Sequence, residues 1–496
     1  MAPTRTDEFP QALRFVNRFR ALGPGFFTEL PTAPLPDPRW GAVSDACAAT
    51  LGWPADWWQR PDTRALEVFS GGTPWPGMAP LASVYSGHQF GVWAGQLGDG
   101  RAHLLGEVQA PGGPLELQLK GGGATPYSRM GDGRAVLRSS IREFLCSEAM
   151  HALGVPTTRA LCLVASDLPV RRETLETAAV VTRVAPSFLR FGHFEHFAHH
   201  DQPARLAALV DFTIAHHFPA CADAPVPAAA LLAEVARRTA ELIAHWQAIG
   251  FCHGVMNTDN LSILGLTIDY GPFGFLDGFD PNHICNHSDH AGRYAYARQP
   301  NVGFWNLHAL AQALLPLIGD TEAALAAIDP YRETFPRALL GRLRAKLGLV
   351  AAHDEDEALA NDWLRLLGAA HTDFTIAFRR LSGFDSRPGA DNGALRDLFV
   401  DRAAFDAWAA PYAARLRAEA SVDAERGPRM DAVNPRIVLR NHLAEQAIRR
   451  AQAGDFDELQ RLHRVLQRPF ADDAGSAADA DFPPAWAGGL EVSCSS

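Results

Sequence analysis

Apolar and polar residues alternate over residues 115–119, and this run ends in Lys120, which three consecutive glycines follow. The period of two predicts a β-strand with one apolar face. Lys120 and Lys346 are the only lysines in a chain that holds 45 Lys and Arg residues, so arginine carries nearly all of its positive charge. A compact ammonium at a strand end, beside a glycine-rich turn, suits contact with a phosphate oxygen in a narrow site. This strand therefore predicts a nucleotide site at one end of a sheet.

Length and charge limit what surrounds that strand. A chain of 496 residues, 47% of them hydrophobic, predicts two or three packed regions. The formal net charge of −11 excludes a general nucleic-acid binder, which needs a basic face. The first 20 residues contain the acidic Asp7 and Glu8 and lack the uninterrupted apolar core of a secretory signal peptide. No apolar stretch in the sequence is long enough to span a bilayer. We therefore expect a bacterial-type cytoplasmic protein without a signal peptide, acting as a monomer.

The cysteine and histidine patterns argue against a metal-binding scaffold. Seven cysteines are scattered with no C-x-x-C pair, which excludes a zinc knuckle and a disulfide framework. The histidine-rich residues 193–201 have no matching set of Cys or His ligands nearby in the sequence. We interpret that stretch as a partly exposed helix or loop.

Local composition predicts five regions in an α+β protein. Residues 1–90 are rich in Pro and Trp and predict an irregular wrapping segment. Residues 91–200 predict a small sheet with one helix, residues 201–345 a helical region with a long loop, residues 346–470 a helical extension and residues 471–496 a flexible tail. The expected strands are 102–108, 115–120 and 160–164, and the expected helices include 139–153 and 229–249.

Two glycine-rich loops lie near Lys120 in the sequence. The first contains Gly98, Gly100 and Arg101 immediately before a predicted strand, and the second contains Asp132 and Gly133. Glycines let backbone N–H groups approach a phosphate, and Arg101 adds positive charge. The first loop by itself is also typical of a hairpin turn. Together with the lysine strand, the two loops predict the walls of a pocket.

A further polar cluster follows the predicted helix 229–249. Asn260 and Asp269 lie on successive segments and offer the oxygen ligands that Mg²⁺ prefers. Asp269-Tyr270-Gly271 resembles the metal-binding Asp-Phe-Gly element of protein kinases, and His253 precedes Asn260 by seven positions, as in the kinase catalytic loop. Glycine loop, strand lysine, helix glutamate, asparagine and aspartate follow one another in the protein-kinase order. We therefore expect a kinase-like fold.

One position departs from the kinase pattern. A kinase places its catalytic aspartate five residues before the metal-binding asparagine, and Val255, which stands there, cannot accept a proton. Either the chain is a nucleotide-binding pseudokinase or another carboxylate acts, for which Asp259 is the candidate. Arg183 and Arg190 lie seven residues apart in the expected linker between the two regions. They would clamp a polyphosphate from the side opposite Lys120.

These motifs together resemble the selenoprotein O family, the kinase-like protein adenylyltransferases also called the YdiU family. The resemblance covers most of the chain and rests on residues 85–91, the region of Lys120, and residues 257–260, 269–275, 286–289, 299–300, 305–307 and 494–496. It implies a two-lobe kinase fold, with a small β-rich lobe carrying one key helix and a helical lobe, that holds ATP in a flipped orientation. AMP would pass from ATP to a Ser, Thr or Tyr hydroxyl of a protein substrate, with Mg²⁺ or Mn²⁺ as cofactor and pyrophosphate as leaving group.

The resemblance also implies roles for single residues. Lys120 would contact the phosphates and pair with Glu143. The apolar stripe of the predicted helix lies nearer to Glu148, which remains the second candidate for that pairing. Asp259 would be the catalytic base, and Asn260 and Asp269 the metal ligands. The other nucleotide-binding positions would be Gly98, Gly100, Arg101, Asp132, Gly133, Arg183 and Arg190, together with Asp269.

Cys494 occupies the position where some family members carry selenocysteine. The resemblance suggests a disulfide between Cys494 and Cys285 that would hold the tail on the segment following Asp269. Two free thiols in a reducing cytosol are the alternative. For the reaction, the alternatives are UMP transfer from UTP with Mn²⁺, phosphate transfer to a small molecule or a protein, and a catalytically silent ATP sensor.

Overall fold

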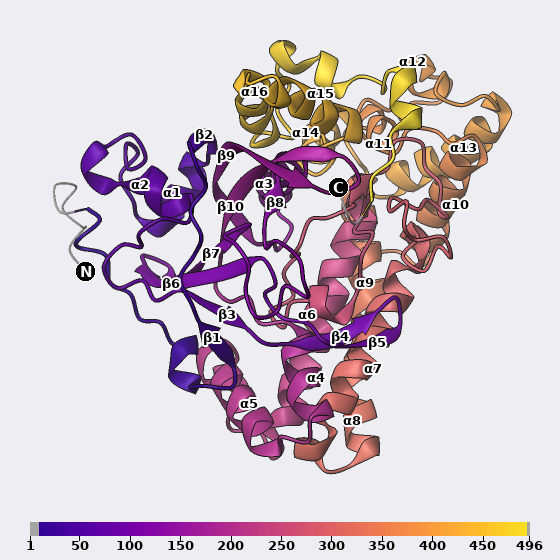
Figure 1. Ribbon diagram of the computed structural model, residues 1–496. Coiled ribbons are helices and arrows are strands. Elements are labelled where there is room, and N and C mark those ends of the chain that lie inside the picture. Colours follow the sequence, from indigo (N-terminus) through magenta and orange to yellow (C-terminus); the bar gives the residue numbers. More distant parts are fainter. Residues whose placement is uncertain (1–8, 494–496) are drawn as a thin grey trace.

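The computed structural model describes residues 9–493, and its central feature is an eight-stranded sheet whose paired strands are antiparallel (Figure 1). The strand order is β1-β3-β6-β7-β10-β9-β2, and β8 pairs with β10 beside this path. The strands of this sheet are β1 (Phe27–Glu29), β2 (Arg39–Val43), β3 (Leu81–Ser83), β6 (Ala102–Ala110), β7 (Gly113–Lys120), β8 (Ala135–Val136), β9 (Arg159–Arg171) and β10 (Leu175–Ala185). Outside the sheet, β4 (Ser86–Gln89) pairs with β5 (Val92–Gln96), and β11 (Phe251–Cys252) pairs with β12 (Gly274–Phe275).

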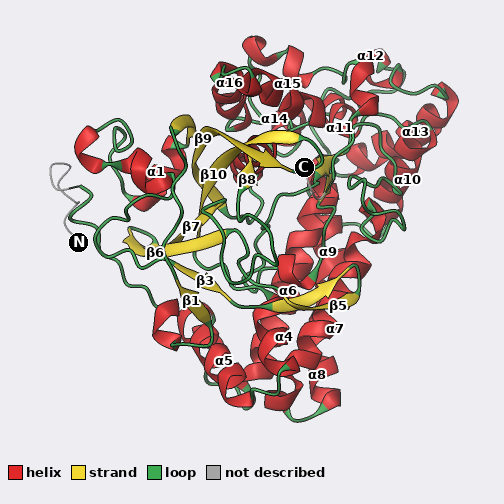
Figure 2. Ribbon diagram, in the orientation of Figure 1, coloured by secondary structure: helices red, strands yellow, loops and turns green. Residues whose placement is uncertain are grey.

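Helices surround the sheet and form most of the second half of the chain (Figure 2). They are α1 (Asp45–Leu51), α2 (Ala65–Phe69), α3 (Leu137–Ala152), α4 (Phe191–His199), α5 (Pro203–His217), α6 (Pro227–Ile249), α7 (Gln299–Ile318), α8 (Thr321–Ile328), α9 (Pro330–Lys346), α10 (Asp356–Ala369), α11 (Phe374–Leu381), α12 (Gly393–Arg396), α13 (Arg402–Ala418), α14 (Asp423–Asp431), α15 (Asn441–Gln452) and α16 (Asp457–Leu466). The architecture is thus a mixed α/β one. No helix in residues 9–493 combines the length and the apolar character needed to cross a membrane.

Strand β7 shows how the alternating sequence builds the site. Leu117 and Leu119 are fully buried in the cluster that includes Trp57 and side chains of α1 and α2. Successive side chains of a strand point to opposite faces, so Gln118 and Lys120 lie on the other face, where Lys120 meets α3. The buried leucines therefore fix the strand against the core, and the polar side chains project from the opposite face of the sheet.

Helix α3 is held from two directions. Ile141 and Phe144 are fully buried in the cluster that also contains strand residues of the sheet. Helix α3 also packs against α15 and α16, where the ring of His463 lies 4.9 Å from that of Phe144 and Arg142 donates to Asn441 Oδ1 at 3.1 Å. The C-terminal helices therefore support the helix that carries Glu143.

The structure corrects two expectations for the first half of the chain. Residues 1–90 are not merely an irregular wrapping segment, because their described part contributes β1 and β3 at one end of the sheet and β2 at the other. Arg183 does not lie in a linker, because β10 is a central strand of the sheet and pairs with both β7 and β9. Strands β1 and β3 have only three residues each, and β10 is buried over most of its length, so neither kind of strand shows the apolar and polar alternation of β7.

The structure also describes the histidine-rich stretch and most of the C-terminal tail. The histidine-rich stretch 193–201 is partly exposed, as predicted: it lies mostly in α4, where His193, Glu195 and His196 are buried, and it ends in the exposed residues 199–201. The described part of the predicted flexible tail contains 3₁₀ turns at Ala474–Ser476, Ala478–Ala480 and Ala485–Gly489. The backbone N–H of His287 donates to the carbonyl of Val492 at 2.8 Å, so the tail packs against the loop after β12.

Candidate functional site

A cavity of about 530 Å³ lies where one end of the sheet meets the loops that follow α6. Its walls bring together eleven of the positions predicted from the sequence. These are Gly98, Gly100, Arg101, Lys120, Asp132, Gly133, Arg183, Arg190, Asp259, Asn260 and Asp269. Segments separated by more than 150 residues in the chain thus form a single pocket.

Glu143, and not Glu148, lies beside Lys120. The Lys120 ammonium is 2.6 Å from Glu143 Oε2, and Arg183 Nη1 donates to Glu143 Oε1 at 3.2 Å. Glu148 is one turn further along α3 and faces the opposite way, where Arg159 donates to both of its oxygens at 2.7 Å. Because α3 is buried on both sides, an apolar stripe could not tell the two glutamates apart.

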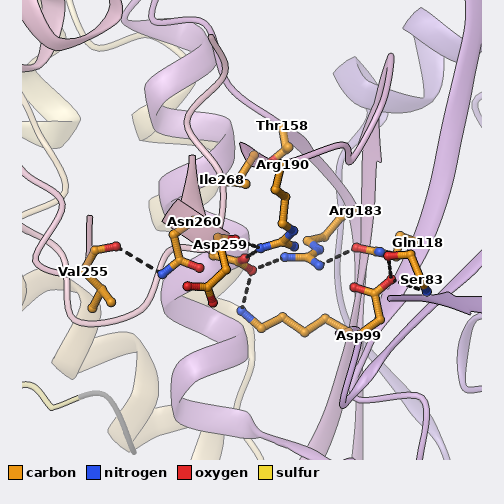
Figure 3. Close-up of polar contacts among 12 residues, drawn as sticks. Ser83, Asp99, Gln118, Thr158, Arg183, Arg190, Val255, Asp259, Asn260 and Ile268 are labelled. Atoms are coloured by element: carbon orange, nitrogen blue, oxygen red, sulfur yellow. Dashed lines mark hydrogen bonds and ion pairs between the residues drawn. The ribbon is translucent and has the colours of Figure 1, made fainter. Parts of the chain in front are cut away.

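Three cationic side chains surround the Asp269 carboxylate. Arg183 and Arg190 each donate to its carboxylate through Nη1, and Lys120 Nζ lies 3.5 Å from Oδ1 (Figure 3). Asp269 has φ of +57°, a left-handed backbone conformation that is uncommon for a residue with a side chain and clusters at functional sites. This backbone conformation aims the carboxylate at the three cations.

Buried charge controls the protonation of this cluster. Burial by itself would raise the pKa of Asp269, but Arg190, Arg183 and Lys120 outweigh it and hold that pKa well below its usual range. Burial also lowers the pKa of Lys120, although Glu143 and Asp269 act in the opposite direction. Asp269 is therefore a carboxylate at neutral pH, and the cluster is rich in positive charge.

Two hydrogen bonds shape the loop that carries Asn260 and Asp269. His253 Nε2 lies 2.9 Å from the carbonyl of Ile268, which ties the start of this loop to the residue before Asp269. Asn260 Nδ2 donates to the carbonyl of Val255 at 3.1 Å, so the amide nitrogen is engaged and the Asn260 oxygen is left for another partner (Figure 3). The motif residues thus fold back on themselves to present oxygen atoms.

Asp259 lies in a 3₁₀ turn, Thr258–Asn260, and differs from Asp269 in its surroundings. Its Oδ2 accepts from the side-chain amide of Gln89 at 3.2 Å, while its Oδ1 is buried and has no hydrogen-bond partner among residues 9–493. Burial, only partly offset by Arg190 and Gln89, raises the pKa of Asp259 to about 6. Asp259 therefore keeps a free acceptor atom, which Asp269 does not.

The donor set suits a divalent cation only in company with a phosphate ligand. The described part of the chain has no group of three His, Cys, Asp or Glu side chains able to hold a metal ion. Asn260 and Asp269 offer two oxygen ligands, and Mg²⁺ commonly takes one or two protein carboxylates and completes its shell with substrate phosphates and water. Asn260 and Asp269 fit that arrangement, provided that phosphates take over the cations now bound to Asp269.

The glycine loops are packed against each other and against the sheet. A Cβ on Gly133, whose φ is +69°, would lie 2.1 Å from the carbonyl of Gly123, and a Cβ on Gly98 would lie 2.6 Å from the ring of Tyr127. Asp132, predicted to bind nucleotide, is held by two hydrogen bonds from Arg172, at 2.8 and 2.9 Å. These contacts give the pocket wall a defined shape.

The sequence did not single out three polar residues that line the pocket or bond to the side chains lining it. Asp99 lies within the first glycine loop and is buried, where it accepts from the backbone N–H and the hydroxyl of Ser83 at 2.9 and 2.6 Å. Gln118 accepts from Arg183, and Gln89 donates to Asp259. For Gln118 a signal existed, since it lies on the same strand face as Lys120. For the others, only tertiary contacts reveal the role.

The predicted disulfide cannot be described, because Cys494 lies outside residues 9–493. Its expected partner Cys285 is buried, and its Sγ lies 3.4 Å from the carbonyl oxygen of Cys252. The described residue nearest in sequence to Cys494 is Ser493, whose hydroxyl lies 3.3 Å from Glu173 on the turn between β9 and β10.

Known proteins are similar in sequence to this chain over nearly its whole length. The sequence model of the family described as "Protein adenylyltransferase SelO" matches residues 10–467. Proteins named "Protein nucleotidyltransferase YdiU" from Cupriavidus metallidurans and Ralstonia nicotianae are each 58% identical, over 96% of this chain and 90% and 95% of their own lengths. A protein of the same name from Burkholderia pseudomallei is 57% identical over 96% of this chain and 95% of its own length. At this level of identity the chain is a nucleotidyltransferase, and it belongs to the SelO protein adenylyltransferase family.

Proposed function

We propose that the protein transfers AMP from ATP to a Ser, Thr or Tyr hydroxyl of a protein substrate. The observation that carries this proposal is that one pocket holds three cations paired with Asp269 and, beside them, a carboxylate that no cation pairs with. Lys120, Arg183 and Arg190 converge on the Asp269 carboxylate, while the neighbouring Asp259 carboxylate forms no ion pair and keeps a free acceptor oxygen, although Arg190 donates to the Asp259 backbone carbonyl at 2.8 Å. Such a pocket suits a polyphosphate held at one end and a hydroxyl activated at the other.

The architecture supports a kinase-like arrangement of two lobes. In this proposal the sheet with α3 forms the small lobe, since Lys120 on β7 pairs with Glu143 on α3. The helical lobe begins near α4 and supplies Asn260 and Asp269 from loops between α6 and α7. ATP would lie between the lobes, against the glycine loops that carry Gly98, Gly100, Arg101, Asp132 and Gly133.

Charge balance favours a flipped nucleotide with its β- and γ-phosphates innermost. The three cations share the carboxylates of Glu143 and Asp269, which leaves an excess of positive charge in a buried place. A triphosphate would balance that excess, and the cations would stabilise the charge that develops on the leaving pyrophosphate. The α-phosphate would then lie nearest Asp259.

Asp259 would orient and deprotonate the acceptor hydroxyl. Val255 occupies the position of the kinase base, is largely buried and cannot take a proton, so it supports a role for Asp259 instead. Asn260 and Asp269 would hold a divalent cation, which would screen the negative charge of the phosphates. The proton from the hydroxyl would pass to Asp259, and the nucleophilic oxygen would form its bond to the α-phosphorus as the bond to pyrophosphate breaks.

The test uses ATP labelled separately at the α- and the γ-phosphate, incubated with the purified protein, Mg²⁺ or Mn²⁺ and a mixture of acceptor proteins. Label on protein from the α-phosphate only is expected. It should fall by about 10²–10⁴-fold in Asp259→Asn, the range typical of a lost general base. Asp211→Asn, an exposed aspartate on α5, is the matched control and should retain full activity.

Other outcomes identify other functions. Transfer of the γ-label would mean a kinase, and stronger labelling from α-labelled UTP than from ATP would mean uridylyl transfer. Nucleotide binding without label from either nucleotide would mean an ATP sensor. Wild-type transfer by Asp259→Asn would remove Asp259 from the mechanism.

A further inference from the structure

The hairpin formed by β4 and β5 stands outside the main sheet and contacts the catalytic turn directly. Figure 1 shows it extending from the sheet toward the helices, and β4 packs on α4 and on the 3₁₀ turn that contains Asp259. Its outer strand is solvent-exposed, with Val92 69% accessible, whereas Gln89 near the turn lines the pocket. The hairpin therefore reaches the active site with one residue and faces solvent with others.

The turn grips the hairpin backbone on both sides of Gln89. Thr258 Oγ1 accepts from the backbone N–H of His88 at 2.7 Å, and Asn257 Oδ1 accepts from that of Phe90 at 3.0 Å. Gln89, between these two anchors, returns a hydrogen bond to Asp259. Three successive side chains of the turn thus bond to three successive residues of the hairpin.

Close packing leaves this contact little freedom. A Cβ on Gly87 would lie 2.7 Å from the Thr258 hydroxyl, and a Cβ on Gly192 of α4 would lie 2.2 Å from the carbonyl of Ser86. His88 Nδ1 also lies 2.6 Å from Glu195 on α4. With the backbone held in this way, the Gln89 amide is delivered to Asp259 at little further cost in conformational entropy.

We propose that Gln89 is a positioning residue that holds the Asp259 carboxylate through Oδ2, so that Oδ1 remains the acceptor for the substrate hydroxyl. This inference rests on the proposed role of Asp259. The Asp259 carboxylate accepts from a neutral amide, and Arg190 reaches only the backbone carbonyl of Asp259, whereas the Asp269 carboxylate is bound by three cations. A neutral donor restrains the carboxylate without pairing it to a positive charge, which a proton acceptor needs.

The test compares Gln89→Met with Gln96→Met. Methionine matches glutamine in length and lacks the amide donor, and Gln96 is an exposed residue of β5 in the same hairpin. For Gln89→Met we expect kcat for α-label transfer to fall at least tenfold, while the Kd for ATP, measured by calorimetry, stays within twofold of wild type. Gln96→Met should match wild type in both. A kcat within twofold of wild type for Gln89→Met would overturn the inference.

Two further measurements separate positioning from loss of structure and from failure of the proposed function. If Gln89→Met lost ATP affinity and melting temperature in parallel with kcat, the role would be structural and the inference wrong. Thr258→Val, which keeps Gln89 but removes an anchor of the hairpin, should lower kcat in the same direction with ATP affinity retained. If Asp259→Asn proved fully active, the proposed base would fail. If Asp259→Asn were inactive and Gln89→Met fully active, only the positioning inference would fail.

The double variant Gln89→Met/Asp259→Asn tests whether Gln89 acts through Asp259. A residue that acts through Asp259 has nothing to position once that carboxylate is gone, so adding Gln89→Met to Asp259→Asn should leave the residual rate unchanged within twofold. A further loss of tenfold or more would show that Gln89 acts independently of Asp259, and the inference would be wrong.

Discussion

Replacement of Glu148 by Gln should destabilise the protein far more than the same change at Glu143. Both glutamates lie on α3 and both are buried, but Glu148 satisfies four donors: two nitrogens of Arg159 at 2.7 Å, the Ser44 hydroxyl at 2.5 Å and the Ala160 backbone N–H at 3.1 Å. Glutamine keeps the shape of the side chain but removes the charge. It would leave the buried Arg159 guanidinium without a counter-ion.

The expected loss for Glu148→Gln is about 3–5 kcal/mol in the free energy of unfolding, the range for breaking one partner of a buried ion pair. Glu143→Gln should lose less, because Lys120 and Arg183 keep Asp269 as a partner. Glu143→Gln should instead impair nucleotidyl transfer, since Lys120 would no longer be held in place. Urea unfolding followed by tryptophan fluorescence, with α-label transfer measured in parallel, checks both variants.

Two controls sharpen this prediction. Glu148→Gln/Arg159→Met removes the unpaired cation as well and should recover part of the lost stability. Burial raises the pKa of Glu148, but Arg159 outweighs that effect and lowers it overall. The stability it contributes is therefore complete above the unfolded value of about 4.3 and is lost as pH falls through the lower folded value. A loss below about 1 kcal/mol at pH 7 would refute the reasoning.

Two further predictions follow from buried charge. Burial lowers the pKa of Lys346 from 10.5 to about 7. Between these two values the unfolded chain binds a proton that the folded protein does not, so the stability of the folded protein should rise with pH over that range. Lys346→Met should therefore be more stable than wild type by a few kcal/mol below pH 7 and equal to it above pH 10.5. Equal unfolding midpoints at pH 6 would contradict this. Three cationic side chains pair with the Asp269 carboxylate and would compete with a metal ion for it. Mn²⁺ binding, measured by electron paramagnetic resonance, should therefore be at least about tenfold tighter in the presence of a non-hydrolysable ATP analogue than in its absence. Equal affinities would show that the cations do not compete with the metal.

Much of the site was predictable because its signals are local. The alternation that ends at Lys120 gave a strand whose observed bounds are Gly113–Lys120, and the predicted helix 139–153 was found as α3, Leu137–Ala152. Asn260 and Asp269, which their spacing along the chain singled out, both line the cavity. In each case residue type and short-range periodicity carry the information, since both follow from the geometry of a single strand, helix or turn.

The missed features depend on contacts between distant segments. Strands β1 and β3, at one end of the sheet, have three residues each, too few for a periodic pattern, and they form because neighbouring strands offer hydrogen bonds. Arg183 lies opposite Gln118 in the register of β10 on β7, which no local pattern encodes. The hydrogen bond from Gln89 to Asp259 joins residues 170 positions apart.

The sequence by itself determined which chemical groups are available, which short segments form strands or helices, and which family the chain resembles. The tertiary structure alone decided which of two glutamates meets Lys120, that three cations converge on Asp269, and that a hairpin supplies an amide to Asp259. The physical reason is that a side chain's partner and its burial depend on how separate elements pack, whereas its residue type and the periodicity around it are properties of the local chain.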